Sequence, residues 1–304
     1  MNRCDQPFAI FAPATSANLG PGFDTLGLAL DLYDEYRFEV SETTSVEVTG
    51  EAAGETPTGE SNLVLNAAIQ YSSILGVEFR HRLVRQVSRI PVSRGLGSSA
   101  AATVAGIVAA CRSAGIEVRR SELIEQATAM EGHPDNVIPA LTGGLSVIAQ
   151  AGSGPVWTKV PFPSDLQIAI AVPETRIETD RARSVLPSEV DFADAIFNVS
   201  RAALLVAALQ RSDYSVLAEA MRDRLHQPHR SSLHPALSEM IDAAYDSGAV
   251  GAALSGSGSA MIAFAESDAE AVGAAMRAAC EAAGVSCTSF TTRVCSEGLR
   301  VRPE

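Results

Sequence analysis

A glycine- and serine-rich segment that runs directly into an apolar helical stretch constrains this chain more than any other feature. The segment is RGLGSSAAATVAG and covers residues 94–106. A glycine-rich turn exposes consecutive backbone N–H groups, and the helix that follows adds a partial positive charge of roughly half an electron. Small residues at a helix start also permit close packing without any ligand. The segment therefore predicts a site for the pyrophosphate of a dinucleotide, for the triphosphate of ATP, or for no ligand.

The surroundings of this segment weaken the dinucleotide interpretation. Residues 95–100 fit the fingerprint G-x-G-x-x-A, but the strand before that fingerprint is normally buried on both faces and continuously apolar. Here the preceding segment 77–92 alternates, contains Pro91, and carries arginines at 82, 85 and 89. The only lysine, Lys159, is far from the glycines, which excludes a Walker A loop. If the ligand is ATP, one of the hydroxyls of Ser98 and Ser99 would bind a phosphate group and the other would bind a Mg²⁺ ion.

The composition excludes several functional classes. The chain has 304 residues and a formal net charge of −13, with no run of basic residues, so we expect no nucleic-acid partner. We find no uncharged apolar run long enough to predict a membrane span and no secretory h-region, so we expect no membrane partner and a cytoplasmic location. The five cysteines are scattered and predict reduced thiols.

The order of predicted elements favours an α+β fold over a doubly wound parallel sheet, because strands and helices do not alternate regularly. Residues 34–50 alternate and predict an antiparallel hairpin. We place a domain boundary at 155–165. The apolar positions of 198–209 predict core or dimer packing. Further strands are predicted at 7–12, 77–92, 166–173, 248–256, 259–266 and 285–294, and helices at 61–76, 98–114, 120–130, 191–211, 213–225, 234–247 and 268–283.

A second segment, PATSANLGPGFDTLGLALD at 13–31, is dense in turn-forming residues. Its glycines and Pro21 predict a compact turn that bends Asn18 and Asp24 toward each other. An amide beside a carboxylate suits the recognition of an amine and a hydroxyl on a small ligand, although an ordinary turn-rich loop is the alternative.

Together, the segments resemble the superfamily of galacto-, homoserine, mevalonate and phosphomevalonate kinases, abbreviated GHMP. Residues 13–30, 91–102 and 251–261 resemble its three motifs, while 131–144 and 178–187 resemble signatures of its homoserine branch. The resemblance implies a two-domain GHMP-kinase fold, with an N-terminal ATP-binding α+β domain over 1–160 and a ferredoxin-like C-terminal domain over 161–304. It also implies ATP-dependent phosphorylation of the L-homoserine side-chain hydroxyl in threonine biosynthesis, and a homodimer.

The resemblance also assigns the ATP site. It implies that residues 91–101 wrap the triphosphate and that Asn62 lies near the adenine. It implies that Ser99, or alternatively Ser98, binds Mg²⁺ together with a glutamate of the following helix, for which we take Glu125, with Glu131 as the alternative. The ATP-binding residues are then Asn62, Pro91, Val92, Ser93, Arg94, Gly95, Leu96, Gly97, Ser98, Ser99, Ala100 and Ala101.

The substrate site follows from the same resemblance. Two arginines can clamp the carboxylate of an amino acid, and Asp24 can pair with its ammonium or its hydroxyl. The implied substrate-binding residues are Asn18, Asp24, His133, Asn136, Thr179, Arg183 and Arg230, of which Asp24, Asn136 and Arg183 are the catalytic candidates. Asn136 stands where mevalonate kinases have an aspartate, so the proton acceptor is either Asp24 or the γ-phosphate. His226, His229 and His234 lack a metal-ligand pattern and are interpreted as loop histidines.

Overall fold

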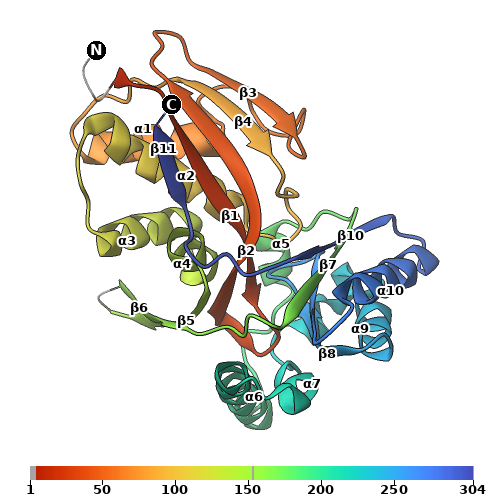
Figure 1. Ribbon diagram of the computed structural model, residues 1–304. Helices are drawn as coiled ribbons and strands as arrows, with labels where there is room; N and C mark the ends of the chain where they lie inside the picture. Colours follow the sequence, from red (N-terminus) through yellow and green to blue (C-terminus); the bar gives the residue numbers. More distant parts are fainter. Residues whose placement is uncertain (1–4, 153, 304) are drawn as a thin grey trace.

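The computed structural model describes residues 5–152 and 154–303 and contains two antiparallel-rich sheets (Figure 1). The first has the order β11-β1-β2-β4-β3, with β5 paired to β2 and β6 paired to β5. Its strands are β1 (Phe8–Asn18), β2 (Gly22–Glu39), β3 (Ser45–Gly50), β4 (Leu83–Ser88), β5 (Leu145–Ala151), β6 (Gly154–Val160) and β11 (Arg300–Pro303). The helices that follow β3 and β4 are α1 (Leu63–Ile74), α2 (Ser98–Ala114), α3 (Arg120–Glu131) and α4 (Pro134–Thr142).

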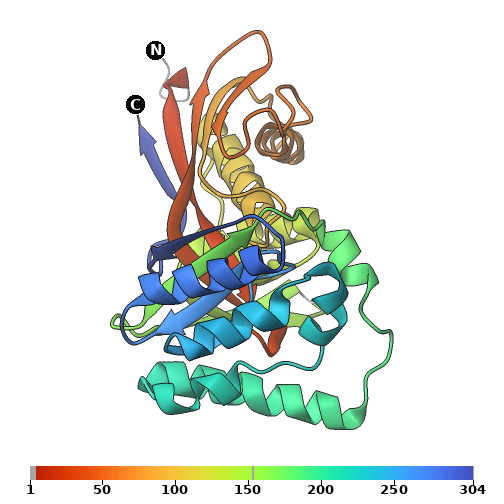
Figure 2. The ribbon, with the colours of Figure 1, turned by 90° about the vertical axis from the view of Figure 1, so that its right-hand side faces the viewer.

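The second sheet consists of β7 (Gln167–Pro173), β8 (Ala249–Leu254), β9 (Met261–Ala265) and β10 (Cys287–Thr292). Its order β10-β7-β9-β8 is the fourth, first, third and second strand along the chain, which is the arrangement of a ferredoxin-like sheet. Helices α9 (Leu237–Asp246) and α10 (Ala269–Ala282) pack on this sheet (Figure 2). The remaining helical segments are α5 (Thr179–Ser184), α6 (Phe192–Arg211), α7 (Leu217–Ala220), α8 (Gln227–Arg230), and the 3₁₀ turns η2 (Tyr214–Val216) and η3 (Ser231–Leu233).

Two local expectations were wrong. Residues 34–50 do not form a hairpin, because β4 lies between β2 and β3, and β3 runs parallel to β4. Residues 213–225 do not form one helix but only η2 and the short α7. Alternation does not reveal which neighbour a strand pairs with, and apolar content alone did not predict how far the helical structure at 213–225 extends.

The change of sheet lies between β6, which ends at Val160, and β7, which begins at Gln167. The last strand returns to the first sheet, where Phe8 of β1 pairs with Pro303 of β11. Dividing the chain at residue 160 therefore leaves each sheet in one part of the chain, except that β11 belongs to the first sheet.

Small residues allow the helices of the first domain to approach closely. A Cβ atom on Gly106 of α2 would lie 2.3 Å from the carbonyl oxygen of Val64 in α1, so this helix pair needs a glycine there. Both helices contribute to the core beneath the first sheet through residues such as Leu65 and Val104. The alanines and glycines of residues 98–114 thus have a packing role in addition to any role at the glycine-rich segment.

Candidate active site

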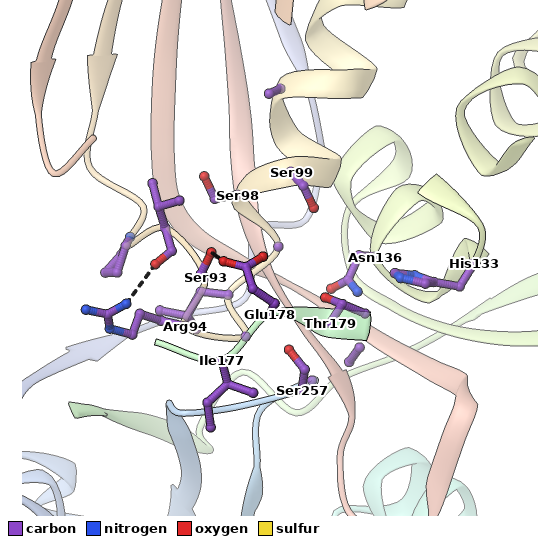
Figure 3. A pocket seen from close by; sticks show the side chains of 18 of the residues that line it. Ser93, Arg94, Ser98, Ser99, His133, Asn136, Ile177, Glu178, Thr179 and Ser257 are labelled. Atoms are coloured by element: carbon purple, nitrogen blue, oxygen red, sulfur yellow. Dashed lines mark hydrogen bonds between the residues drawn. The ribbon is translucent and has the colours of Figure 1, made fainter. Parts of the chain in front are cut away.

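A cleft of about 350 Å³ collects residues from both domains (Figure 3). One end is lined by the residues that connect β4 to α2, and the other by the tip of the β1–β2 hairpin, the start of α4, α5 and α8. We call residues 91–99 the phosphate loop and residues 18–24 the substrate loop. The predicted residues that line the cleft are Asn18, Asp24, Asn62, Pro91, Val92, Ser93, Arg94, Gly95, Leu96, Gly97, Ser98, Ser99, His133, Asn136, Thr179, Arg183 and Arg230. Ala100 and Ala101 are fully buried in the core instead.

The phosphate loop is shaped by backbone contacts that exclude larger side chains. Gly95 and Gly97 have φ angles of 74° and 69°, in the left-handed region. A Cβ on Gly95 would lie 2.1 Å from the carbonyl oxygen of Ser255, and one on Gly97 would lie 1.9 Å from Oγ1 of Thr15. The glycines therefore let the loop pack between β1 and the turn that follows β8.

The start of α2 offers free backbone donors to the cleft. The N–H of Ala101 makes the first helical hydrogen bond, to the carbonyl of Gly97 at 2.9 Å. The N–H groups before it have no partner within the helix, as at any helix start. The hydroxyls of Ser98 and Ser99 lie at the same helix start and line the cleft (Figure 3), and a helix start with hydroxyls beside it suits an anion.

The Arg94 side chain turns away from this end of the cleft. Its Nε donates to the carbonyl of Pro173 at 2.9 Å and its Nη1 to the carbonyl of Val92 at 3.0 Å. Burial lowers the pKa of its guanidinium. Arg94 thus ties the phosphate loop to β7, while Ser93 Oγ donates to Glu178 at 3.2 Å across the cleft (Figure 3).

Ser99 contacts Glu131 rather than Glu125. Its Oγ donates to Glu131 Oε2 at 2.9 Å, and Thr103 Oγ1 donates to Glu131 Oε1 at 2.6 Å. The side chain of Glu125 in α3 lies against the β5–β6 turn instead: a Cβ atom added to Gly154 would be 3.4 Å from the Cγ of Glu125. Six residues along a helix correspond to a separation of about 120° around its axis. Of the two candidates, Glu131 and not Glu125 therefore lies beside Ser99, and the metal ligand itself stays a prediction.

Asn62 is occupied by structural hydrogen bonds. As N-cap of α1, its Oδ1 accepts from the N–H of Val64 at 3.1 Å, and its Nδ2 donates to the carbonyl of Pro57 at 2.9 Å. It supports this wall of the cleft by holding the loop before α1. The same wall is also lined by residues that the sequence analysis did not predict: Thr56, Pro57, Leu63 and Gln86. The loop at 51–60 carries no motif that would mark Thr56 or Pro57.

The substrate loop is strained and locked by its own side chains. Asn18 and Asp24 have φ angles of 70° and 54°, which are rare for residues other than glycine. Asn18 Oδ1 accepts from the N–H of Asp24 at 3.1 Å, and Asn18 Nδ2 donates to the carbonyl of Gly256 at 2.9 Å. The predicted proximity of Asn18 and Asp24 is thus present, with Asn18 positioning Asp24.

Asp24 and Arg183 bind each other across the cleft. Arg183 Nη2 donates to Asp24 Oδ1 at 2.6 Å, and Nη1 donates to Oδ2 at 3.1 Å. Both side chains are about one-third exposed. The Phe23 ring lies 5.3 Å from the Arg183 guanidinium carbon and 5.4 Å from that of Arg230, so one aromatic ring contacts both cations.

Arg230 is a buried cation with a fixed orientation. Its Nε donates to the carbonyl of Ala182 at 3.1 Å, and its Nη1 donates to the carbonyl of Gly256 at 2.9 Å. Burial, followed by the charge of Arg183, lowers its pKa to about 10, so it remains charged at neutral pH.

His226 is the buried neighbour of Arg230. Its Nδ1 lies 3.2 Å from Arg230 Nη1, and its Nε2 lies 2.8 Å from the carbonyl of Gly20. These partners require a neutral ring that donates from Nε2 and accepts at Nδ1. Burial lowers the pKa of His226, which favours the same neutral form. His226 is a loop residue, as predicted, but it is fully buried and holds Arg230 in place.

Polar side chains contact one another on the third side of the cleft. Thr15 Oγ1 donates to Asn136 Oδ1 at 2.8 Å, and His133 Nδ1 lies 3.0 Å from Asp135 Oδ1. The hydrogen bond to Asp135 raises the pKa of His133. Asn136, His133 and Thr179 line this side of the cleft together (Figure 3).

Two family models match parts of this chain. Residues 62–144 match the model of the GHMP kinases N terminal domain, and residues 205–282 match GHMP kinases C terminal. The homoserine kinase of Moorella thermoacetica is 42% identical over 289 residues, which cover 95% of this chain and 98% of that protein. The chain belongs to the homoserine kinase family of GHMP kinases.

Other homoserine kinases support this assignment. The homoserine kinase of Desulfitobacterium hafniense is 41% identical over 95% of this chain and 98% of its own length. A crystal structure of homoserine kinase from Cytophaga hutchinsonii superposes with a TM-score of 0.87 at 32% identity, covering 98% of each chain. The Leishmania major mevalonate kinase, with a TM-score of 0.73 at 18% identity over 93% of this chain and 94% of its own, shares the fold. The predicted family, fold class and kinase activity are confirmed.

Helix α6 is long and apolar enough, by length and composition, to cross a membrane. It contains Asp194 and Arg201, so it is not an uncharged apolar run of the kind that the sequence analysis looked for. Leu205 and Leu209 on one side of α6 are buried, whereas most of the helix is exposed.

Proposed function

We propose that this chain transfers the γ-phosphoryl group of ATP to the side-chain hydroxyl of L-homoserine, forming O-phospho-L-homoserine and ADP in threonine biosynthesis. The observation that supports this most is one cleft with two different ends. Free N–H groups at the start of α2 suit a polyphosphate. Asp24, Arg183 and Arg230 at the other end suit a zwitterionic amino acid.

The substrate-binding roles follow from charge and position. The ammonium of homoserine pairs with Asp24, whose position is set by Asn18, and its carboxylate binds Arg230 together with Arg183. Because Asp24 and Arg183 are bonded to each other, the substrate has to exchange this pair for contacts with its own charges. His133, Asn136 and Thr179 enclose the hydroxyl end of the substrate.

The chemical step is an in-line phosphoryl transfer. The homoserine oxygen forms a bond to the γ-phosphorus while the bond to the β,γ-bridging oxygen breaks, and ADP leaves with that oxygen. Positioning and charge stabilisation supply most of the rate in such reactions, and Arg183 stabilises charge on the transferred group. Asn136 is an amide, so the hydroxyl proton passes to Asp24 or to a γ-phosphate oxygen.

The donor atoms at the start of α2 fit Mg²⁺. Among the described residues no group of three or more His, Cys, Asp and Glu side chains could hold a metal ion. Mg²⁺ commonly uses one or two carboxylates and completes its shell with substrate phosphates and water, so Glu131 and Ser99 suffice to hold it. When bound, Mg²⁺ supplies charge neutralisation on the phosphate oxygens.

An ADP-release assay tests the proposed activity. L-homoserine, L-serine, L-threonine, mevalonate and galactose are compared at saturating ATP and Mg²⁺. We expect L-homoserine to have the highest kcat/KM, because it alone combines an ammonium, a carboxylate and a hydroxyl at the right reach. A higher kcat/KM for any of the other alcohols would contradict the proposal.

The cellular setting is part of the proposal. An acidic chain with a net charge of −13 suits a cytoplasmic enzyme of small molecules without nucleic-acid or membrane partners. We also propose that the chain forms a homodimer.

A further inference from the structure

Asp34 is a buried residue beside the start of the phosphate loop that does not line the cleft. It lies in β2 and is 0% exposed. Its Oδ1 accepts from the N–H of Arg89 at 2.7 Å and from the N–H of Ile90 at 2.9 Å. Its Oδ2 accepts from the hydroxyl of Tyr36 at 3.2 Å and from that of Ser88 at 3.4 Å. Buried polar groups need such partners, so this carboxyl group fixes the chain around it.

The two backbone bonds to Asp34 form where the pairing of β4 with β2 stops. These strands pair antiparallel as far as Glu35 with Val87 (Figure 1). The N–H groups of residues 89 and 90 then bond to the Asp34 side chain instead of to a strand. Pro91 comes next and has no N–H, so these two are the last backbone donors before the phosphate loop. Asp34 therefore sets the point at which the chain leaves the sheet and the loop begins.

Later residues of the phosphate loop are held by other parts of the chain. The hydroxyl of Ser255 donates to the carbonyl of Gly95 at 2.7 Å, and the N–H of Thr15 donates to the carbonyl of Leu96 at 3.0 Å. Losing the contacts of Asp34 should therefore displace the beginning of the loop and leave its later part in place. We expect a partial loss of nucleotide affinity for this reason, rather than a complete one.

A second buried aspartate has a similar arrangement near the substrate end of the cleft. The side chain of Asp223 is 0% exposed. Its Oδ1 accepts from the N–H of Leu225 at 3.0 Å, and its Oδ2 accepts from the N–H groups of His226 at 3.0 Å and Gln227 at 2.7 Å. Gln227 begins α8, and Arg230 ends it. Asp223 therefore fixes the start of the short helix that brings Arg230 to the cleft.

We propose that Asp34 and Asp223 are positioning residues for phosphoryl transfer, Asp34 for the phosphate loop and Asp223 for Arg230. Neither residue lines the cleft, so each acts through the backbone that it holds. Positioning supplies much of the rate in phosphoryl transfer, so these indirect contacts matter for activity. The role of Asp223 rests on the proposed function, because its measurement uses homoserine, whereas the role of Asp34 needs only a nucleotide at the phosphate loop.

Replacing each aspartate by alanine tests the two assignments against each other. Titration calorimetry measures binding of the β,γ-imido analogue of ATP with Mg²⁺, and ADP release measures the KM for homoserine at saturating ATP. Asp34→Ala should weaken nucleotide binding about tenfold and change the KM for homoserine less than about twofold, because it frees only the phosphate loop. Asp223→Ala should show the opposite pattern. Equal effects of one substitution on both ligands, or no effect on either, would overturn the proposal.

Replacement by asparagine should affect the two sites differently. In Asp34→Asn, Oδ1 can keep both backbone N–H groups while the new NH₂ group faces the hydroxyls of Tyr36 and Ser88, which can accept, so nucleotide affinity should stay within about threefold of the wild type. Both carboxyl oxygens of Asp223 face N–H donors, so an amide NH₂ meets a donor in either orientation. Asp223→Asn should therefore raise the KM for homoserine as Asp223→Ala does. An Asp34→Asn chain as weak as Asp34→Ala, or a wild-type KM for Asp223→Asn, would refute these atomic roles.

Tyr36→Phe is the matched control for Asp34. It removes one hydrogen bond to Oδ2 and leaves both backbone bonds to Oδ1 in place, so it should lower the Tm but keep the nucleotide dissociation constant within about twofold. A loss of nucleotide binding as large as that of Asp34→Ala would show general loosening of β2 and overturn the proposal. If Asp34→Ala does not fold, Asp34→Ser, whose shorter side chain cannot reach both N–H groups, should give a smaller loss, and unchanged binding would overturn the role of Asp34. These nucleotide measurements decide that role even if the chain proves not to act on homoserine.

Discussion

The two ends of the cleft differ in the groups that line them and in where those groups come from in the sequence. The phosphate end is one continuous run of chain, residues 91–99, in which Gly95 fits against the backbone of Ser255 and Gly97 against the hydroxyl of Thr15. The substrate end consists of side chains from separate segments, and those side chains already bind one another, as Asp24 and Arg183 do. The phosphate end is therefore formed in advance, whereas the substrate end has to exchange its internal contacts for contacts with the ligand.

Replacing Arg183 should give the largest difference between homoserine use and ATP binding, which report on the two ends of the cleft. Arg183→Ala is expected to lower kcat/KM for homoserine about 1,000-fold, because an arginine that stabilises charge in phosphoryl transfer typically contributes that much. The dissociation constant of ATP, measured by titration calorimetry, should change little. Arg181→Ala, an exposed residue of the same helix, is the control. A parallel loss of ATP affinity would place Arg183 at the phosphate end.

The free energy of unfolding should depend on His234 in acid. Burial lowers the pKa of His234 to about 4, and its Nε2 lies 3.3 Å from the carbonyl of Ser257, a residue that lines the cleft. An unfolded histidine has a pKa of about 6.5. The stability is complete above that pH and falls toward pH 4, because the unfolded chain binds a proton that the folded chain does not, at a cost of about 3 kcal/mol.

Urea unfolding at several pH values measures this contribution. The excess stability of the wild type over His234→Gln should shrink between pH 7 and pH 4. His229→Gln, which alters an exposed histidine, should keep the wild-type pH dependence. A constant difference between wild type and His234→Gln at all pH values would show that His234 is not held neutral.

Glu131, beside Ser99, and Glu125, beside the β5–β6 turn, lie on the same helix and form a matched pair for substitution. Glu131→Gln should lower kcat/KM about 30-fold and raise the Mg²⁺ concentration for half-maximal activity, because the amide is a weaker ligand. Glu125→Gln should leave both quantities within about twofold. The reverse outcome would restore the assignment of Glu125 that was first made from the sequence.

The smallest effect is expected for His226, which positions Arg230 without reaching the substrate. His226→Phe removes the hydrogen bonds to Arg230 and Gly20 and should raise the KM for homoserine about tenfold. The value of kcat should change less, and His226→Gln should recover part of the loss. A reduced kcat with an unchanged KM would point to a different role for this ring.

Much of the fold and of the site could be predicted because the signals were local. The glycines at 95 and 97 mark the phosphate loop through their own backbone requirements, and Gly97 directly precedes α2 as expected. The choice between Glu125 and Glu131 could not be made reliably, because both residues occur on one helix and only the packing of α3 reveals which face meets Ser99. His226 and His234 lie in loops, as predicted. Their burial could not be predicted, because it arises from segments that are distant in the sequence.

The sequence by itself determined where the phosphate loop lies and that an amino-acid kinase of the GHMP type forms, since these depend on residues close together in the chain. Tertiary structure decided which charges meet. Asp24 binds Arg183 across 159 positions, and Arg230 is held by the carbonyls of Ala182 and Gly256. Such pairings depend on how the two sheets pack against each other, and a linear pattern of residues carries no direct record of that packing.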